Sequence, residues 1–394
     1  MAEAVGARQG ARFLRSATLA LFTLAAGCSV VPKGPPRPVV TPPVIDTPDP
    51  VSPTLPTDVE RNRVALLVPL TGPNAGVGTS ISHAANMAVL DTGGAKIRVT
   101  MYDTGTGAAA AAQRALAEGN RLILGPLLAD DVRAVAPIAR AARVPVISFS
   151  NDTGVAGNGT FVMGYTPAQS IERVVAYAQS KGMTKFAGLI PAGLYGQRAS
   201  TAFIRSVEAG GGQVVSMQNF DRSSGSVAAA ITRLRQTSPY EAILIADSGR
   251  TAIQAAPIIR AKGGATAKIL GTELWNSDGA LASSPGLRGA WFASVSDGLY
   301  NQLASKYRAR FGRAPYRLAS LGYDAVLLVT RIAGDWRPGS AFPAGRLTDS
   351  GGFSGIDGAF RFGRDGIVER ALEVQQAGSG GSTIVSAAPR GFGN

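Results

Sequence analysis

The sequence predicts an α/β protein with two doubly wound parallel-sheet lobes joined by three crossover segments. From Arg63 onwards, short apolar segments alternate with longer segments of helical character. The first apolar segment, Val64–Val68, is continuous, which is typical of a parallel strand covered by helices on both faces. After Asn158-Gly159 the same alternation starts again, so we expect a second lobe of the same kind. Two sheets joined in this way leave a cleft that a hinge can open and close.

The expected elements follow this alternation in chain order. In the first lobe we expect strands over Val64–Val68, Lys96–Tyr102, Leu122–Gly125 and Val144–Ser148, and helices over Thr79–Leu90, Ala108–Glu118 and Asp130–Ala142. In the second lobe we expect helices over Pro167–Lys181, Ser200–Ala209, Val227–Gln236 and Ala252–Lys262, leading into strands over Phe186–Ile190, Gln213–Met217, Ala242–Ala246 and Lys268–Gly271. Two more helices, Tyr300–Gly312 and Pro315–Ile332, precede a hairpin over Phe353–Phe362 and a strand over Val368–Val374.

These elements set the expected boundaries. We assign residues 61–165 and 291–352 to the first lobe, and residues 166–290 and 353–376 to the second. The Gly/Ser-rich residues 377–394 are expected to form a flexible tail.

The N-terminus carries an export signal. Three arginines lead into the apolar segment Ala17–Ala26, which ends at Gly27-Cys28 and is too short to span a bilayer. The end of this segment, Leu24–Cys28, resembles a bacterial lipoprotein box. Residues 1–27 are therefore expected to be a lipoprotein signal peptide, with Cys28 as the lipidated first residue of the mature protein. An ordinary cleaved signal that happens to contain a cysteine is the alternative. Ser29, where Asp would favour retention, implies an outer-membrane lipoprotein facing the periplasm.

Residues 28–60 are expected to form a linker after the lipidated cysteine. Ser29–Glu60 contains ten prolines and few residues that could form a core. Such segments favour extended polyproline conformations, and at about 3.1 Å per residue the reach is at most roughly 100 Å. The linker would hold a globular body away from the membrane, to which only the lipid attaches it.

Composition argues against several classes of function. The net charge is +13, but no run of Lys and Arg is interleaved with aromatic residues, so we expect no nucleic-acid partner. His83 is the one histidine and Cys28 the one cysteine, and clusters of metal-ligating residues are missing. A hydrolase would have to use His83 as its base. We therefore expect no catalytic residues, no metal and no cofactor.

The glycine-rich loop Gly72–Gly78 lies between a predicted strand and a predicted helix. Backbone N–H groups at such a place can hold an anion. The loop lacks the Gly-Lys-Ser/Thr ending of a phosphate-binding loop. Its glycines could equally serve close packing beneath the cleft, and the sequence leaves both roles open.

Several motifs in order point to a family. Val64–Asn86, Ile123–Pro126, Val144–Asn151 and Tyr195-Gly196 resemble periplasmic binding proteins of the leucine-binding type, which have the type I periplasmic-binding-protein fold. Within this type, the chain most resembles the branch of penicillin-binding protein activators. The motifs that carry this resemblance are Val64–Gly72, Ser148–Asp152, Leu270–Trp275, Leu287–Phe292 and Gly355–Phe362. The resemblance covers residues 61–376.

The resemblance implies a non-enzymatic function. Activators of this branch are outer-membrane lipoproteins that reach through the periplasm and stimulate a bifunctional penicillin-binding protein, which is a peptidoglycan synthase. The best-known activators carry an all-helical domain before the α/β body, where this sequence has the proline-rich linker. The surface that contacts the synthase is therefore not carried over residue by residue.

The resemblance also implies a candidate ligand site in the cleft. In amino-acid receptors of this fold, hydroxyl and N–H groups of the first lobe hold the carboxylate, and an acid and a tyrosine of the second hold the ammonium. The matching positions, with two further cleft positions and an apolar wall, are Asn74, Leu127, Ser148, Ser150, Asn151, Tyr195, Asp247, Glu273 and Trp275. Leu127 departs from the pattern, because a receptor typically has a small hydroxyl residue there.

Each of these residues also has a structural role available to it. Ser148 and Ser150 could instead form turns, and Trp275 could pack in the core. Three hypotheses follow: a regulator of a peptidoglycan synthase, which we prefer, a solute-binding protein for an amino acid, small peptide or peptidoglycan fragment, and a hydrolase.

Overall fold

The computed structural model describes residues 60–392 except residues 222, 235, 237–238, 263 and 277–278 and the side chain of Ser224. Residues 57–394 form one compact unit. The predicted signal peptide, Cys28 and the linker up to residue 59 lie outside the described residues. Among the described residues, no helix is long and apolar enough to cross a bilayer.

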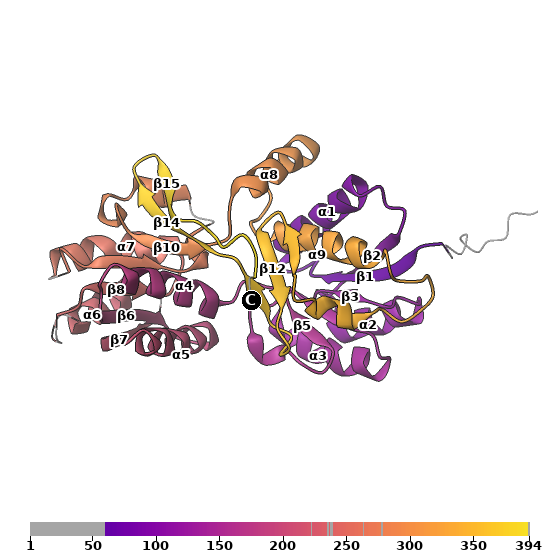
Figure 1. Cartoon of the computed structure of the whole chain (residues 1–394), viewed down its shortest axis with the longest axis horizontal. Coiled ribbons are helices and arrows are strands. Elements are labelled where there is room, and N and C mark those ends of the chain that lie inside the picture. The colour runs from indigo at the N-terminus through magenta and orange to yellow at the C-terminus, as the bar shows by residue number, and fades with distance from the viewer. Residues whose placement is uncertain are drawn as a thin grey trace, which may run out of the picture. The chain divides into compact units, whose positions relative to one another are not determined.

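The first lobe is built on a parallel sheet of five strands in the order β2-β1-β3-β4-β5 (Figure 1). The strands are β1 (Asn62–Val68), β2 (Ile97–Asp103), β3 (Ile123–Leu124), β4 (Val146–Ser148) and β5 (Thr160–Val162). The helices that connect them are α1 (Ala75–Asp91), α2 (Ala108–Ala117) and α3 (Ala129–Ala141). Val64–Val68 is fully buried, so the prediction from its continuous apolar run is confirmed.

The second lobe has a sheet of seven strands in the order β15-β14-β10-β9-β8-β6-β7. Its parallel strands are β6 (Lys185–Pro191), β7 (Gln213–Phe220), β8 (Ala242–Ile245), β9 (Lys268–Gly271) and β10 (Trp291–Ser294). The last two strands, β14 (Glu373–Gly378) and β15 (Gly381–Ser386), are antiparallel. Its helices are α4 (Pro167–Ser180), α5 (Leu194–Ala209), α6 (Ser224–Leu234) and α7 (Gly249–Ala261). Two doubly wound lobes are thus confirmed.

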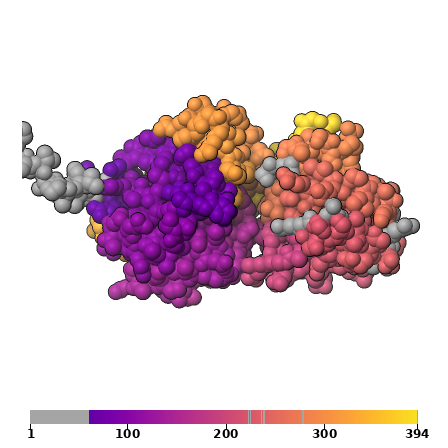
Figure 2. Space-filling model, turned by 180° about the vertical axis from the view of Figure 1, so that it is seen from behind, coloured from indigo at the N-terminus to yellow at the C-terminus, as the bar shows by residue number. Residues whose placement is uncertain are grey.

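The chain passes between the lobes in three places: after β5, after β10, and between β13 and β14. The middle return carries α8 (Gly298–Phe311), α9 (Ala319–Ile332) and a small sheet of β11 (Phe353–Gly355), β12 (Gly358–Phe362) and β13 (Val368–Arg370). Helix α9 packs against α1, and the orange atoms of this segment lie against the indigo and purple atoms of the first lobe (Figure 2).

The predicted lobe boundaries were wrong for two segments. Trp291–Ser294, assigned to the first lobe, is β10 of the second sheet, where it pairs with β9 and β14. Residues 353–370, assigned to the second lobe, pack on the first-lobe core through Phe353, Phe360 and Val368. The predicted strand Val368–Val374 is therefore two strands, because the chain changes lobe at Ala371-Leu372.

The predicted tail over residues 377–394 was also wrong in its first half. Ala377 is 4% exposed, and Gly381–Ser386 forms β15 by pairing with β14. Gly and Ser here make a tight hairpin at an edge of the sheet, a conformation that the same composition also favours.

A buried ionic cluster lies where the three crossing segments meet. Arg317 Nη1 donates to Asp357 Oδ1 at 2.8 Å, and the side chains of these residues are 10% and 0% exposed. The Tyr165 hydroxyl lies 2.7 Å from the Ser320 hydroxyl and also donates a short hydrogen bond to Asp357. Buried charges persist only when they are paired and hydrogen-bonded in this way.

The cluster takes a residue from each crossing segment. Tyr165 follows β5, Asp297 follows β10 with its carboxylate 3.6 Å from Arg317 Nε, and Arg370 ends β13 and donates to the Met163 carbonyl at 2.6 Å. Aromatic rings cover the guanidinium groups: Arg317 lies 4.0 Å from the centre of the Tyr300 ring, and Arg370 lies 4.9 Å from that of Tyr165. Ion pairs and hydrogen bonds therefore join the three crossing segments to one another.

Asp324 supports this cluster from below. Its carboxylate is buried and accepts hydrogen bonds from the N–H groups of Ile356 at 2.7 Å and Asp357 at 3.3 Å. Burial, reinforced by the negative charge of Asp357, raises the pKa of Asp324 to about 7.

The glycine-rich loop gives a first prediction. A methyl group on Gly78 would lie 1.8 Å from the backbone oxygen of Pro69, so Gly78→Ala should lower the free energy of unfolding by about 1–3 kcal/mol. Gly225 of α6 has open space around it, so Gly225→Ala should leave that free energy unchanged or raise it by up to about 1 kcal/mol. Urea denaturation measures both, and equal effects would contradict the packing role of Gly78.

Asp324 gives a prediction on pH. A folded-state pKa above the unfolded value of 3.8 makes the stabilising contribution largest at low pH, and that contribution is lost as pH rises to about 7. The free energy of unfolding of Asp324→Asn minus that of the wild type should therefore be larger at pH 8 than at pH 5. Urea unfolding at both pH values measures this difference. The exposed Asp365→Asn variant is the control, and an Asp324→Asn curve parallel to that of the wild type would contradict the assignment.

Candidate functional site

Two of the predicted second-lobe residues meet at the carboxyl ends of the strands. Tyr195 lies in the first turn of α5, and Glu273 lies directly after β9. The Tyr195 hydroxyl donates to Glu273 Oε1 at 3.0 Å and lies 3.2 Å from Thr272 Oγ1. The Ser170 hydroxyl of α4 donates a short hydrogen bond to the other carboxylate oxygen, Oε2. Both oxygens of Glu273 therefore already have donors from the protein itself.

Burial dominates the electrostatics of this group. It raises the pKa of Glu273, and the hydrogen bonds from Ser170 and Tyr195 partly oppose the rise. The pKa of Tyr195 is raised well above its usual value by burial and by the charge of Glu273. Tyr195 therefore stays protonated and serves as a hydrogen-bond donor.

Asp247 lies beside this group, at the end of β8. It is 3% exposed, and its Oδ1 accepts from the N–H of Ser248 at 2.6 Å, which positions the start of α7. The Asp247 carbonyl accepts from the Trp275 indole N–H at 2.9 Å. These contacts make Asp247 part of the framework behind Glu273.

The first-lobe hydroxyls are used within their own loop. The Ser148 hydroxyl donates to the Pro126 carbonyl at 3.2 Å and accepts from the N–H of Ser150 at 3.0 Å. The Ser150 hydroxyl accepts from the N–H of Asp152 at 3.1 Å. Both serines are buried, so their contacts are those of turn formation. Asn151, between them and Asp152, is exposed.

Asn74 and Leu127 have local roles. Asn74 directly precedes α1 at the N-cap position, and its side chain makes no capping hydrogen bond. Leu127 is half-buried and packs on the first-lobe core. Its side chain therefore has a packing role in the first lobe.

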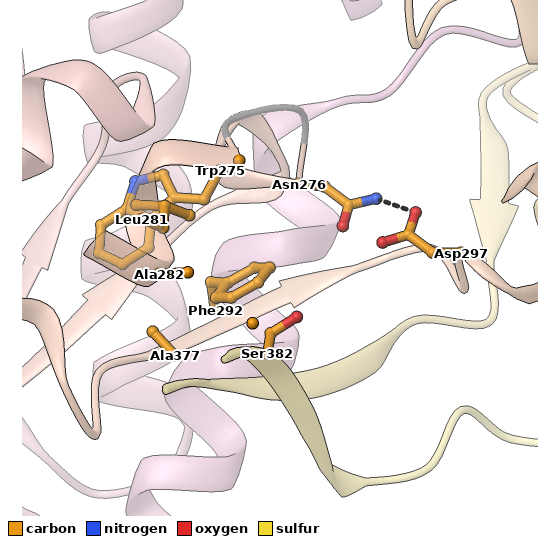
Figure 3. A pocket seen from close by; sticks show the side chains of 10 residues that line it. Trp275, Asn276, Leu281, Ala282, Phe292, Asp297, Ala377 and Ser382 are labelled. Carbon is orange, nitrogen blue, oxygen red and sulfur yellow. Dashed lines mark hydrogen bonds between the residues drawn. The ribbon is translucent and has the colours of Figure 1, made fainter. Parts of the chain in front are cut away.

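Trp275 was expected to be an apolar wall of the cleft, but it belongs to the second-lobe core. It is 1% exposed, and its ring centre lies 5.9 Å from that of Phe292. With Leu281 it lines a cavity of about 170 Å³ in the second lobe (Figure 3). Asn276 and Asp297 are hydrogen-bonded at the polar side of this cavity, at 2.9 Å.

His83 has the surroundings of a packed histidine. Its Nδ1 lies 3.0 Å from the Tyr307 hydroxyl, and its ring stacks on Phe311 with centres 4.0 Å apart. Burial lowers its pKa, and the charge of Arg313 adds to the effect. No serine or acid contacts its ring among the described residues, and no metal-binding cluster of His, Cys, Asp and Glu occurs in this part of the chain either.

A contact between the lobes was missed by sequence reasoning. Asp152 is 4% exposed and lies 2.5 Å from Arg133 of α3 and 3.3 Å from Arg198 of α5. Arg198 belongs to the second lobe, so the carboxylate joins both lobes. Asp152 ends the motif Ser148–Asp152, but nothing in the local sequence around Arg198 indicates its distant partner.

Residues 62–382 match the model of the periplasmic binding protein family. Over 140 residues the chain is 30% identical to the uncharacterised protein RP748 of Rickettsia prowazekii, a match that covers 35% of this chain and 38% of that protein. The match thus spans well under half the length of this relative.

Solved structures share the fold at low sequence identity. A branched-chain amino acid ABC transporter periplasmic ligand-binding protein from Burkholderia xenovorans LB400 matches with a TM-score of 0.69 and 17% identity, covering 85% of this chain and 97% of that one. The C-domain of LpoA from Haemophilus influenzae, a regulator of PBP1A, matches with a TM-score of 0.64 and 19% identity, covering 82% and 100%. The two-lobed fold and the match over residues 62–382 lead to one conclusion: the protein belongs to the periplasmic binding protein family.

Proposed function

We propose that this protein is a non-enzymatic periplasmic lipoprotein that binds and stimulates a peptidoglycan synthase of the bifunctional penicillin-binding protein class. The observation that carries the proposal is the hydrogen bonding around Glu273, at the carboxyl ends of the second-lobe strands. Both oxygens of Glu273 accept hydrogen bonds from Ser170 and Tyr195, and the hydroxyls of Ser148 and Ser150 are used in turns. The polar groups expected to hold an amino acid are therefore occupied by one another.

A ligand at this group would have to replace these bonds. A buried polar group that loses its partner costs about 1–3 kcal/mol, and more if it is charged. The ammonium of an amino acid would have to offset the loss of two donors to Glu273. Leu127 offers the carboxylate no donor in return. A protein that acts by docking leaves these hydrogen bonds intact, so this cost does not arise.

Similarity to known proteins supports the same direction. The sequence motifs resemble the activator branch, and the fold matches the whole C-domain of LpoA, a regulator of PBP1A. The predicted lipid at Cys28 and the proline-rich linker would let such a body reach a partner in the periplasm from the outer membrane. The family and the absence of a histidine–serine contact in the described part of the chain favour a non-enzymatic role.

One observation favours a solute-binding protein as a second candidate. Tyr195 and Glu273 lie together at the strand ends, as an ammonium site of this fold requires. A ligand that displaces the Ser170 hydroxyl could then bind between the lobes.

The regulator proposal predicts stimulation in a purified assay. The full lipidated chain in detergent, added to the bifunctional synthase of the same organism, should raise the rate of glycan polymerisation or cross-linking in a saturable way. The physical basis is docking, so the response should follow the fraction of synthase bound, measured by cross-linking or co-purification. Binding without stimulation, or no effect at saturating protein, would contradict the proposal.

Calorimetry separates the second candidate. The regulator proposal predicts that amino acids and peptidoglycan fragments give no heat that depends on Glu273. Sub-millimolar binding by the wild type that is lost in Glu273→Gln would favour a solute receptor instead.

The anchor gives a prediction of its own. Cys28→Ser should move the protein from the membrane fraction to the soluble periplasmic fraction, because the thiol is the expected site of the lipid. Ser29→Asp should leave it lipidated but retained in the inner membrane. Fractionation on a sucrose gradient measures both, and a Cys28→Ser protein that stays with the outer membrane would contradict lipid anchoring.

A further inference from the structure

Two adjoining cavities lie at the end of the first lobe where the strands of its sheet begin. Their volumes are about 530 and 340 Å³, and Asn62 and Pro338 line both. Asn62 is the first residue of β1, and Lys96 and Arg121 shortly precede β2 and β3. Because the strands of this sheet are parallel, their amino ends lie at the edge opposite to Ser148. The cavities therefore do not belong to the candidate site at the carboxyl ends of the strands.

Asn62 has a buried polar atom without a partner. Its side chain is 3% exposed, and its Nδ2 donates to the Trp336 carbonyl at 2.8 Å. Its Oδ1 has no hydrogen-bond partner within the described part of the chain. Buried polar atoms normally have one, from the protein or from a bound molecule. Since this oxygen only accepts, the missing partner is a molecule with an O–H or N–H group.

The walls of the cavities carry an excess of positive charge. The basic side chains that have no acidic partner among the described residues are Arg63, Lys96, Arg121 and Arg337. Arg61 lines the smaller cavity as well. The acids of the walls are Glu60 and Asp335, and Asp335 already pairs with Arg346 at 3.1 Å. Such an excess attracts anions, and guanidinium groups bind carboxylates through paired hydrogen bonds.

The walls offer little apolar surface. Their apolar side chains are those of Ala95, Ala333, Pro338 and Trp336, and Trp336 is 3% exposed. None of the large apolar side chains that are exposed in the described residues lines either cavity. Proteins that lie on a lipid layer insert apolar side chains into it, and those that bind single-stranded nucleic acid stack exposed aromatic rings on its bases. These walls therefore suit a polar ligand.

We infer that the two cavities bind an acidic oligosaccharide, a chain of sugar units that carry carboxylates. A sugar hydroxyl would donate to Asn62 Oδ1, and carboxylates would accept from Arg121 in one cavity and from Arg337 in the other. Each cavity lies within the roughly 300–1,000 Å³ of ordinary ligand sites, so the pair has room for more than one sugar unit. One class of ligand thus supplies both the missing donor and the negative charge. The site goes beyond the docking function, which does not depend on it.

Titration calorimetry on the full lipidated chain in detergent, at low ionic strength, tests the inference with trigalacturonate. We expect saturable binding, and binding at least about tenfold weaker for maltotriose, a trisaccharide without carboxylates. Arg121→Gln should weaken trigalacturonate binding about tenfold, because it removes a charged donor. Asn62→Ala should also weaken it about tenfold, because it removes the acceptor. Arg250→Gln, which changes an exposed arginine of α7 in the second lobe, is the matched control and should leave binding unchanged.

Three results would overturn the inference: no saturable binding of trigalacturonate, equal affinity for maltotriose, or equal affinity in Arg121→Gln and the wild type. Phosphatidylglycerol vesicles are a further probe, used with the Cys28→Ser chain so that no lipid anchor inserts. Binding to these vesicles without binding of trigalacturonate would overturn the inference in favour of a membrane surface.

Folding is checked for both variants by the urea midpoint. Arg121 is exposed, so Arg121→Gln should keep the midpoint of the wild type. Asn62→Ala also loses the hydrogen bond to Trp336, and if it does not fold, the comparison of Arg121→Gln with the wild type decides. Stimulation of the synthase is measured without trigalacturonate, so the failure of this inference leaves the docking proposal standing.

Discussion

The buried carboxylate of Asp357 is the group on which the joining of the two lobes depends. It is buried and accepts from Arg317 and from Tyr165, and an unpaired charge at this position would be strongly destabilising. Tyr165 follows β5 in the first crossing segment, and Arg317 also lies 3.6 Å from Asp297 of the second, so the first two crossing segments meet at the Arg317–Asp357 pair. Arg370 adds the third through the Met163 carbonyl. The junction of the lobes is thus held by a buried, charge-paired cluster that takes residues from all three crossing segments.

The polar side chains at the strand ends are likewise paired within the protein. Glu273, Tyr195 and Ser170 satisfy one another in the second lobe, and Ser148 and Ser150 satisfy the backbone in the first. Asp152 and Arg198 then join the lobes on one side. These polar side chains thus have their partners within the protein.

The elements themselves could be predicted because their signals are local. A continuous apolar run such as Val64–Val68 needs helices on both faces wherever it lies in the fold. The predicted helices begin and end within four residues of the observed ones, except that α5 begins at Leu194, six residues before the predicted Ser200. Trp291–Ser294 reads equally well as a strand of either sheet, so its lobe could not be deduced. Its position depends on pairing with β14, which comes about eighty residues later in the chain. The lobe of residues 353–370 could not be deduced for the same reason.

The candidate site also has features that local sequence predicts and features that depend on distant residues. The sequence by itself determined the repeated α/β architecture and the residue types at the strand ends, because these follow from periodicity and from position after a strand. The expectation that Tyr195 and Glu273 act together came from the family resemblance. Only the tertiary structure decided that Ser170 closes on Glu273, that Trp275 turns into the core, and that Arg317 and Arg198 reach acids from other segments. Hydrogen bonds and ion pairs of this kind join residues distant in sequence. The strength of each depends on burial and on a geometry of a few ångströms, which no local pattern encodes.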